Sequence, residues 1–207
     1  MMNQRSIQSA FQEITKAVSE QVELLTQLDQ QSGDGNLGVS MRSGFEAANA
    51  LVSASEETDC GLLLNAAANA FNQAAPSSLG TILTFFCKGM ARGLRGKQRF
   101  DRGELASAMQ CGLSNVMDKA GSKPGEKTIL DSLVPGVSAL AEDHPSNLDA
   151  FSAAAQAAES GAEATRTMKA VWGRAAYYGE QSIGRIDGGV VVGKLIFQSL
   201  LRAVQNA

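Results

Sequence analysis

The sequence predicts an all-α fold, an up-and-down barrel or bundle of eight antiparallel helices with a ligand site at one end. Apolar residues recur at steps of three and four along most of the chain, which is the spacing of one helix face. Few stretches alternate between apolar and polar residues as strands do. No linker, repeat or low-complexity segment divides the chain, so we expect a single domain over residues 1–207.

The helical pattern is clearest in the first segment, and the same spacing predicts seven further helices. The alanine-rich stretch AFSAAAQAAESGAEA favours close packing between helices. The apolar stripe of the first segment consists of Ile7, Phe11, Ile14, Val18, Val22, Leu25 and Leu28. The further helices are expected near residues 39–54, 62–73, 78–95, 104–119, 127–142, 148–170 and 189–205.

The composition argues against several classes of protein. A net charge of −3 does not fit a general nucleic-acid binder. There is no run of eighteen apolar residues to span a membrane, and the opening stretch MMNQRSIQSA lacks the apolar core of a signal peptide. Three cysteines, far apart and odd in number, favour a reduced, cytoplasmic setting. The one histidine, His144, is interpreted as a solvated turn residue, which leaves no histidine-based triad.

The connections between the predicted helices differ in composition at the two ends of the bundle. In an up-and-down arrangement, the first, third, fifth and seventh connections lie at one end. Glycine and aspartate concentrate in these four, whereas EETDCG, GKQRFDRG and EDHPSN resemble ordinary polar turns. The asymmetry predicts a ligand site at one end, although tight turns also use glycine. The four connections are SGDGNLG (32–38), AAPSS (74–78), GSKPGEK (121–127) and WGRAAYYGEQSIGRIDGG (172–189).

Two carboxylates and an amide in the first connection suggest a metal site. Asp29 lies in the last turn of the first helix, where the helix dipole disfavours a negative charge by about 0.3–1 kcal/mol. Asp34 and Asn36 follow within a glycine-rich loop. Magnesium prefers oxygen ligands, usually a few carboxylates with waters and phosphates. The alternative is that Asp34 only makes a turn with Gly35 and that Asp29 is solvated.

The second and third connections have features of a phosphate site. Ser77 and Ser78 begin a predicted helix, where a serine is either an N-cap or part of a phosphate site made by free N–H groups. Gly121, Gly125 and Lys127 could continue such a cradle from the third connection.

The fourth connection brings two arginines and an aspartate into fourteen residues: Arg174, Arg185 and Asp187. The guanidinium of Arg174 could hold phosphate oxygens in a bidentate arrangement. A surface ion pair is the competing interpretation for this arginine.

Three stretches together resemble the nucleotide-binding L subunit of dihydroxyacetone kinase. GDGNLGVSM is similar to the metal loop of that family, GEKTILDSLVP to its central motif, and GRAAYYGEQSIGRIDGG to its C-terminal signature. The resemblance covers nearly the whole chain and keeps the order of the motifs. It implies an eight-helix antiparallel barrel that holds a nucleotide at one end, with Mg²⁺ between aspartates and phosphates.

The resemblance also assigns roles to individual positions, and it assigns no catalytic residue beyond the metal and nucleotide ligands. The implied metal ligands are Asp29, Asp34 and, at the position of a third aspartate, Asn36. The implied nucleotide contacts are Leu37, Gly38, Ser40, Ser77, Ser78, Gly121, Ile129, Arg174, Asp187, Gly188 and Gly189.

By this resemblance the chain is a phosphotransferase subunit of the glycerone kinase type. It would carry Mg²⁺ with ADP or ATP and transfer a phosphoryl group to a short ketose. A K-type partner subunit would hold that ketose through its own histidine. In phosphotransferase-system versions the ADP stays bound as a relay, so a phosphocarrier protein is a further possible partner. No nucleic acid or membrane is expected as a partner.

Departures from the family pattern fall inside the expected site. Asn36 coordinates through an amide oxygen without a negative charge, and Leu37 replaces the usual histidine. Ala75 and Pro76 replace a glycine pair, and their side chains restrict close approach to phosphate. These changes support an alternative function, a non-catalytic paralogue that binds a partner or regulator protein and has weakened nucleotide binding. A kinase with a different substrate and altered metal stoichiometry is a further alternative.

Overall fold

The computed structural model describes residues 1–207 and contains nine α-helices, two 3₁₀ segments and one pair of short strands. The helices are α1 (Gln4–Glu20), α2 (Val22–Gln30), α3 (Leu37–Ala54), α4 (Cys60–Ala74), α5 (Ser78–Gly93), α6 (Arg102–Ala120), α7 (Leu130–Ala141), α8 (Asn147–Ala164) and α9 (Gly188–Gln205). The 3₁₀ segments are η1 (Thr165–Thr167) and η2 (Arg174–Ser182), and the strands are β1 (Met2–Asn3) and β2 (Arg99–Phe100).

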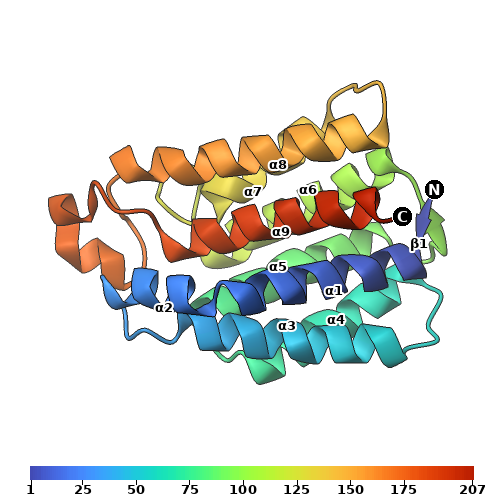
Figure 1. Ribbon diagram of the computed structural model, residues 1–207, viewed down its shortest axis with the longest axis horizontal. Helices are drawn as coiled ribbons and strands as arrows, with labels where there is room; N and C mark the ends of the chain where they lie inside the picture. Colours follow the sequence, from blue (N-terminus) through green and yellow to red (C-terminus); the bar gives the residue numbers. More distant parts are fainter.

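The helices form a closed antiparallel ring, which confirms the all-α prediction (Figure 1). Each helix from α3 to α8 packs against the next one along the chain, and α8 packs against α9. The ring closes because α1 packs between α9 and α3. α2 continues α1 and contacts the same two neighbours, so α1 and α2 together occupy one of eight positions in the ring.

The first predicted helix is bent, which the apolar spacing did not reveal. Gln21 leaves the helical conformation (φ −111°, ψ 12°), and its N–H donates to the carbonyl oxygen of Val18 at 3.1 Å. The apolar stripe continues through the bend because Val18 and Leu25 are both fully buried. A periodicity in the sequence therefore cannot distinguish one straight helix from two that share a buried face.

Two other predicted helices have different limits. The helix expected at 127–142 begins only at Leu130, because the Asp131 carboxylate accepts the N–H groups of Gly125 (2.5 Å) and Thr128 (2.7 Å) and holds the preceding residues in turns. The helix expected at 148–170 ends as α8 at Ala164 and continues only as the short segment η1.

The two ends of the barrel differ in what they carry. The connections α2–α3, α4–α5, α6–α7 and α8–α9 lie at one end, where the long α8–α9 connection projects beyond the ring (Figure 1). Both chain termini and the connections α3–α4, α5–α6 and α7–α8 lie at the other end. There β1 pairs antiparallel with β2, with Met2 opposite Phe100.

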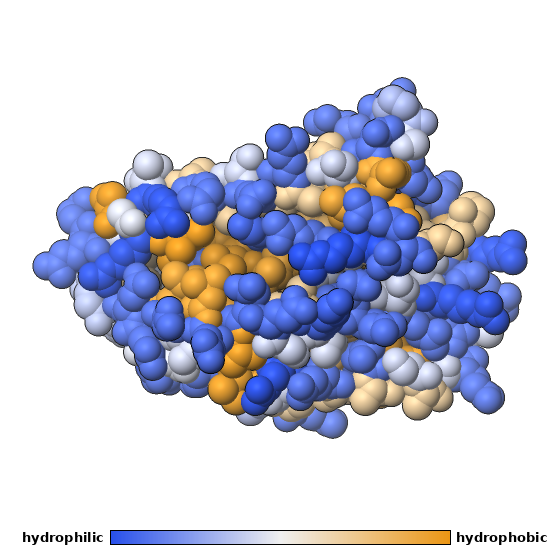
Figure 2. All heavy atoms as spheres, in the orientation of Figure 1, coloured by the Kyte–Doolittle hydropathy of each residue, from blue (hydrophilic) through white to orange (hydrophobic).

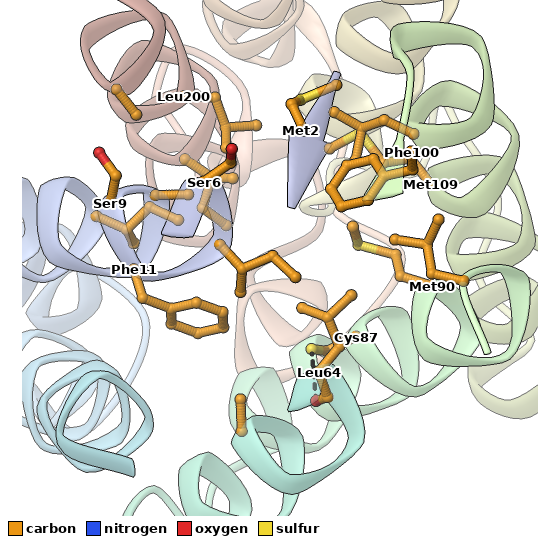
Figure 3. A pocket seen from close by; sticks show the side chains of 18 of the residues that line it. Met2, Ser6, Ser9, Phe11, Leu64, Cys87, Met90, Phe100, Met109 and Leu200 are labelled. Carbon is orange, nitrogen blue, oxygen red and sulfur yellow. Dashed lines mark hydrogen bonds between the residues drawn. The ribbon is translucent and has the colours of Figure 1, made fainter. Parts of the chain in front are cut away.

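The interior of the barrel contains an apolar cavity of about 580 Å³ toward the end that carries β1 (Figure 3). Of its 31 lining residues 25 are hydrophobic, so this space has a different chemistry from the polar connections at the opposite end. The Cys87 thiol faces it and donates to the carbonyl oxygen of Leu64 at 3.4 Å. Burial raises the pKa of this thiol to about 12, so it is protonated at neutral pH.

The outer surface is mostly hydrophilic on the face shown in Figure 2. Apolar residues gather on this face toward the end that carries α2 and the start of α9. None of the helices combines the length and the apolar composition that crossing a bilayer would require.

Glycines bring α5 and α6 unusually close together. A Cβ atom on Gly89 would lie 2.6 Å from the carbonyl oxygen of Cys111, and one on Gly112 would lie 2.7 Å from the carbonyl oxygen of Phe86. Both obstacles are backbone atoms, which cannot rotate away as a side chain can. The contact joins the later turns of α5 to the middle of α6 and sets how closely these two neighbours in the ring pack.

We expect Gly89→Ala to lower the free energy of unfolding by about 1–3 kcal/mol, because the added methyl group must separate two packed backbones. Gly103→Ala is the matched control, since it lies in the exposed first turn of α6 with only the Asp101 carboxylate near its Cβ position. There alanine should be neutral or stabilise the helix by up to about 1 kcal/mol. Urea unfolding followed by circular dichroism measures both changes, and equal stability of the two variants would contradict the close contact.

Candidate functional site

A polar cavity of about 810 Å³ lies at the end of the barrel that carries the long α8–α9 connection. Its wall includes residues from each of the connections α2–α3, α4–α5, α6–α7 and α8–α9. The structure therefore brings together segments as far apart in sequence as residues 28 and 189. Eleven of the fourteen predicted site residues line this cavity: Asp29, Asp34, Asn36, Leu37, Ser77, Ser78, Ile129, Arg174, Asp187, Gly188 and Gly189.

The other three predicted residues, Gly38, Ser40 and Gly121, do not line the cavity. Gly38 is buried where α3 approaches α2, and a Cβ atom there would overlap the carbonyl oxygen of Val22. The N–H of Ser40 bonds to the Asn36 carbonyl oxygen inside α3. Gly121 ends α6 in the left-handed conformation (φ 72°), which glycine adopts without strain. In this structure these three residues shape the helix ends beside the cavity.

Asp29 lies in the C-terminal turn of α2, and a hydrogen bond to the next helix explains a carboxylate at this position. Its Oδ2 accepts the N–H of Leu37, the first residue of α3, at 3.2 Å. It thus satisfies a free donor at the next helix start, although Asn36 is the residue in the N-cap position. Gly33 permits this arrangement, because a Cβ atom there would overlap the Asp29 carboxylate. Asn36 makes no capping bond with its side chain, so its amide is not committed to α3.

Asp34 and Arg174 form an ion pair of 2.9 Å across the cavity. Their side chains are 45% and 60% exposed, so the surface-pair interpretation of Arg174 describes this structure. An exposed pair of this kind contributes about 0–1 kcal/mol to stability and is easily exchanged for another partner. The pair joins a candidate metal ligand to a candidate phosphate ligand.

Two helices, α5 and α9, begin at the cavity. Ser77 is the N-cap of α5 and its Oγ accepts the N–H of Gly80 at 3.1 Å, as the N-cap interpretation expects. Ser78 is the first helical residue, and its side chain lines the cavity. Asp187 is the N-cap of α9 and accepts the N–H of Val190 at 3.0 Å. Helix starts carry partial positive charge and free N–H groups, which suits an anionic ligand between them.

The Asp187 side chain is half-buried at the cavity wall, and the loss of solvent around its carboxyl group raises the pKa of that group to about 6. The N–H groups of Val190 and Gly189 and the positive charge of Lys127 oppose this shift, while the negative charge of Asp131 adds to it. At neutral pH the group is therefore ionised for the most part, close to a buried ammonium group.

Lys127 does not extend the expected phosphate cradle with its ammonium group. The side chain is buried, and Nζ donates to the carbonyl oxygens of Met168, Ser182 and Arg185. Gly125 likewise directs its N–H to the Asp131 carboxylate and not to the cavity. Both residues of the third connection therefore have structural partners.

Several cavity residues were not predicted as ligands from the sequence, among them Thr128, Trp172 and Tyr178. Arg185, the second arginine of the α8–α9 connection, links two connections. It donates to the carbonyl oxygen of Gln31 at 2.7 Å and lies 5.5 Å above the centre of the Tyr178 ring. The only signal for these residues was their position in the glycine-rich connections, because the contacts join residues up to 154 positions apart.

The residues that replace the family pattern have clear positions. Leu37 contacts Gly188, where an added Cβ would lie 2.5 Å from the leucine Cδ2. Ala75 is fully buried at the end of α4, and Pro76 lines the cavity. The cavity wall is therefore more apolar at Leu37 and Pro76 than a histidine or a glycine would make it.

No three His, Cys, Asp or Glu side chains group together as a metal site anywhere in residues 1–207. A cation in the cavity would have the two carboxylates of Asp29 and Asp34 and the amide oxygen of Asn36 as nearby hard donors. This donor set suits Mg²⁺ that also takes ligands from phosphate and water, and it lacks the soft donors that select zinc.

Comparison with known proteins agrees with the geometry. Residues 31–202 match the DAK2 domain. The chain is 32% identical over 192 residues to the ADP-binding subunit DhaL of the PEP-dependent dihydroxyacetone kinase of Escherichia coli, with 91% of each chain covered. It is 30% identical to the L-erythrulose kinase of Pectobacterium atrosepticum, over 88% of this chain and 32% of that protein.

The fold is similar to that of a solved structure, the dihydroxyacetone kinase from C. freundii in complex with AMP-PNP and Mg²⁺. The TM-score is 0.74 at 21% identity, over 94% of this chain and 33% of that one. Since the family match spans most of the barrel and the E. coli subunit is similar over nearly its full length, the chain belongs to the DAK2 domain family.

Proposed function

We propose that this chain is the nucleotide-binding subunit of a dihydroxyacetone-type kinase, a phosphotransferase that carries Mg²⁺ with ADP or ATP. One observation carries the proposal: a single polar cavity joins Asp29, Asp34 and Arg174 with the starts of α5 and α9. Carboxylates for a cation, a guanidinium and two helix N-termini are the groups that a bound nucleotide diphosphate with magnesium requires. A volume of about 810 Å³ is within the range of small-molecule sites.

Catalysis at such a site is positioning and charge neutralisation. Asp29, Asp34 and Asn36 would hold magnesium, which when bound neutralises phosphate charge and polarises the phosphoryl oxygens. Arg174 would leave Asp34 for the phosphate when the cation replaces it at that carboxylate. Ser78, the first residue of α5, would present its N–H to the same phosphates, while Ser77 caps the helix.

A K-type subunit that holds the ketose is the partner we propose, and it would dock at the α8–α9 connection. Phosphoryl transfer requires the acceptor to reach the nucleotide cavity, so the partner must contact this end of the barrel. Five of the ten large hydrophobic side chains exposed on the molecule belong to this one connection. Exposed aromatic residues are typical of binding surfaces. The five are Val171, Trp172, Tyr177, Tyr178 and Ile183.

The alternative function, a paralogue that binds a partner protein without catalysis, makes a different prediction for the purified protein. It is favoured by Asn36, which leaves two carboxylates for the cation, and by the more apolar wall at Leu37 and Pro76. A protein that binds no Mg-ADP in calorimetric titration would support it. A phosphocarrier protein as phosphoryl donor and a cytoplasmic location also remain predictions.

Arg174→Ala should weaken ADP binding in the presence of Mg²⁺ by about 1.5–3 kcal/mol, or about 10- to 150-fold, because a charged phosphate loses a charge-assisted partner. The melting temperature should change little, since the pair with Asp34 is exposed. The matched control is Arg166→Ala, which removes another exposed arginine paired with Glu163. Isothermal titration calorimetry gives the affinities, and equal values for the two variants would leave Arg174 as a surface pair only.

Without nucleotide, the same Arg174→Ala variant should bind Mg²⁺ more tightly than the parent protein. The guanidinium then no longer neutralises Asp34, and the carboxylate is free to take the cation. Titration with MgCl₂ alone measures this change, which is opposite in sign to the change in ADP affinity. Weaker Mg²⁺ binding by the variant would contradict a cation site at Asp34.

Asn36→Asp should tighten the magnesium-dependent part of ADP binding, and Asp34→Asn should nearly abolish it. One charge at about 4 Å is worth on the order of 4 kcal/mol at an effective dielectric of ~20, before desolvation and competing waters reduce it. We therefore expect the parent protein to keep one Mg²⁺ with the nucleotide, or a second at low occupancy. ADP affinity measured across a Mg²⁺ series decides this, and no effect from either substitution would exclude this loop as the metal site.

Tyr177→Ser should reduce the rate of phosphoryl transfer with a K-type subunit and leave ADP affinity unchanged. The Tyr177 side chain is 91% exposed and does not line the cavity, so its loss affects docking alone. Leu62→Ser removes an exposed hydrophobic residue on α4 and is the control. Steady-state kinetics at varied partner concentration give the comparison, and identical kinetics for both variants would place the docking surface elsewhere.

A further inference from the structure

Lys127 is a buried lysine at the wall of the polar cavity, and its backbone is unusual. The residue is 5% exposed. Its φ of 60° is the only positive value outside glycine in the protein. Left-handed backbone is disfavoured for residues with a Cβ atom, and glycine would adopt it more easily. We therefore expect the lysine side chain to make contacts that offset the cost of this backbone conformation, which glycine would adopt without that cost.

Each of the three N–H donors of the Lys127 ammonium group makes a hydrogen bond within the protein. Nζ donates to the carbonyl oxygens of Met168 at 3.1 Å, Ser182 at 2.6 Å and Arg185 at 2.7 Å. An ammonium group has three donors, so no N–H remains for a ligand. The three acceptors come from the beginning, the later part and the end of the connection between α8 and α9.

The three attachment points lie close in the sequence to the cavity residues of that connection. Arg174 lies between the first and second attachment points, and Asp187 follows the third by two residues. The connection contains only the 3₁₀ segments η1 and η2, and Gly179 interrupts η2 with φ 52°. A segment with so little regular backbone bonding depends on side chains to hold it. Charge-assisted bonds to a buried ammonium are the strongest interactions available to it.

The residue beside Lys127 reinforces the attachment. The Glu126 carboxylate accepts the indole N–H of Trp172, and its carbonyl oxygen accepts the N–H of Val171 at 3.3 Å. Within the connection, the Ser182 hydroxyl accepts the N–H of Ala170 at 2.9 Å. The α8–α9 connection is therefore bonded both to the residue beside Lys127 and to itself near the ammonium group.

We propose that Lys127 is a positioning residue that holds the connection from residue 165 to residue 187 against the cavity, and so fixes where Arg174 and Asp187 stand. The ammonium group replaces the hydrogen bonds that the segment does not make with itself. The effect on a nucleotide rests on the function proposed above, whereas the placement of the connection does not. A measurement of how firmly the connection is held therefore tests the proposal separately from nucleotide binding.

Lys127→Met tests the proposal, because it keeps an unbranched side chain in the buried space but removes the charge and all three donors. Lys123→Met is the matched control, the same substitution at an exposed lysine four residues earlier in the same connection. Trp172 is the only tryptophan of the chain and lies within the held segment, so its fluorescence reports the placement of the segment directly. Trypsin cleavage after Lys169, Arg174 and Arg185 gives a second reading.

We expect Lys127→Met to shift Trp172 emission toward that of free tryptophan and to speed cleavage within 165–187 by about tenfold or more, because the segment opens locally. Lys123→Met should match the parent protein in both measurements. Circular dichroism verifies that the barrel remains helical in every variant. Unchanged emission and cleavage in a folded Lys127→Met protein would overturn the proposal.

Two further variants separate the ammonium group from the turn. Lys127→Gly relieves the left-handed backbone but removes the donors, so it should release the segment as Lys127→Met does. Lys127→Arg keeps a charged donor and should restore part of the protection from trypsin. If Lys127→Gly instead protects the segment as well as the parent protein, the position serves only the turn and the proposal fails.

ADP affinity is the final reading. If the parent protein binds Mg-ADP, Lys127→Met should weaken that binding by about tenfold or more although Lys127 itself offers no N–H to the ligand, and Lys127→Arg should recover part of it. Unchanged ADP affinity with a released segment would overturn the link to the cavity. No ADP binding by the parent protein would reject the proposed nucleotide function, and the fluorescence and cleavage readings would still decide the role of Lys127.

Discussion

The closure of the helices into one ring is the constraint on which the polar site depends. Because α1 packs between α9 and α3, each helix has a fixed neighbour on both sides, and successive connections must alternate between the two ends. Four connections then meet at one end, and each contributes part of the cavity wall. None of these connections makes a binding site alone. The site is a property of the arrangement, and a change that opened the ring would disperse it.

Charged groups at this end of the barrel are held in two ways, by an exposed ion pair and by buried contacts. Arg174 neutralises Asp34 at the exposed mouth, while the positive charge of Lys127 in the wall partly offsets the raised pKa of Asp187. Asp29 is turned to the start of α3. Exposed pairs exchange partners at little cost, whereas the buried lysine with three carbonyl acceptors does not. The mouth can thus rearrange around a ligand while the wall stays in place.

Much of the fold was predictable because helical spacing survives in the sequence wherever one face is buried, as in the stripe from Ile7 to Leu28. Alternation of the connections then placed most of the proposed site residues at one cavity. The bend at Gln21 was not predictable, since both halves bury the same face. The partners of Lys127 and the bond from Leu37 to Asp29 were missed because contacts across connections leave no periodic signal.

The position of the two termini sets a condition on how this domain can be joined to another. Both lie at the end of the barrel opposite the cavity (Figure 1). α9 alone has 18 residues, so its length is roughly 27 Å. A tether that leaves the C-terminus must run back along the whole barrel, at least about eight extended residues, before an attached domain can face the cavity.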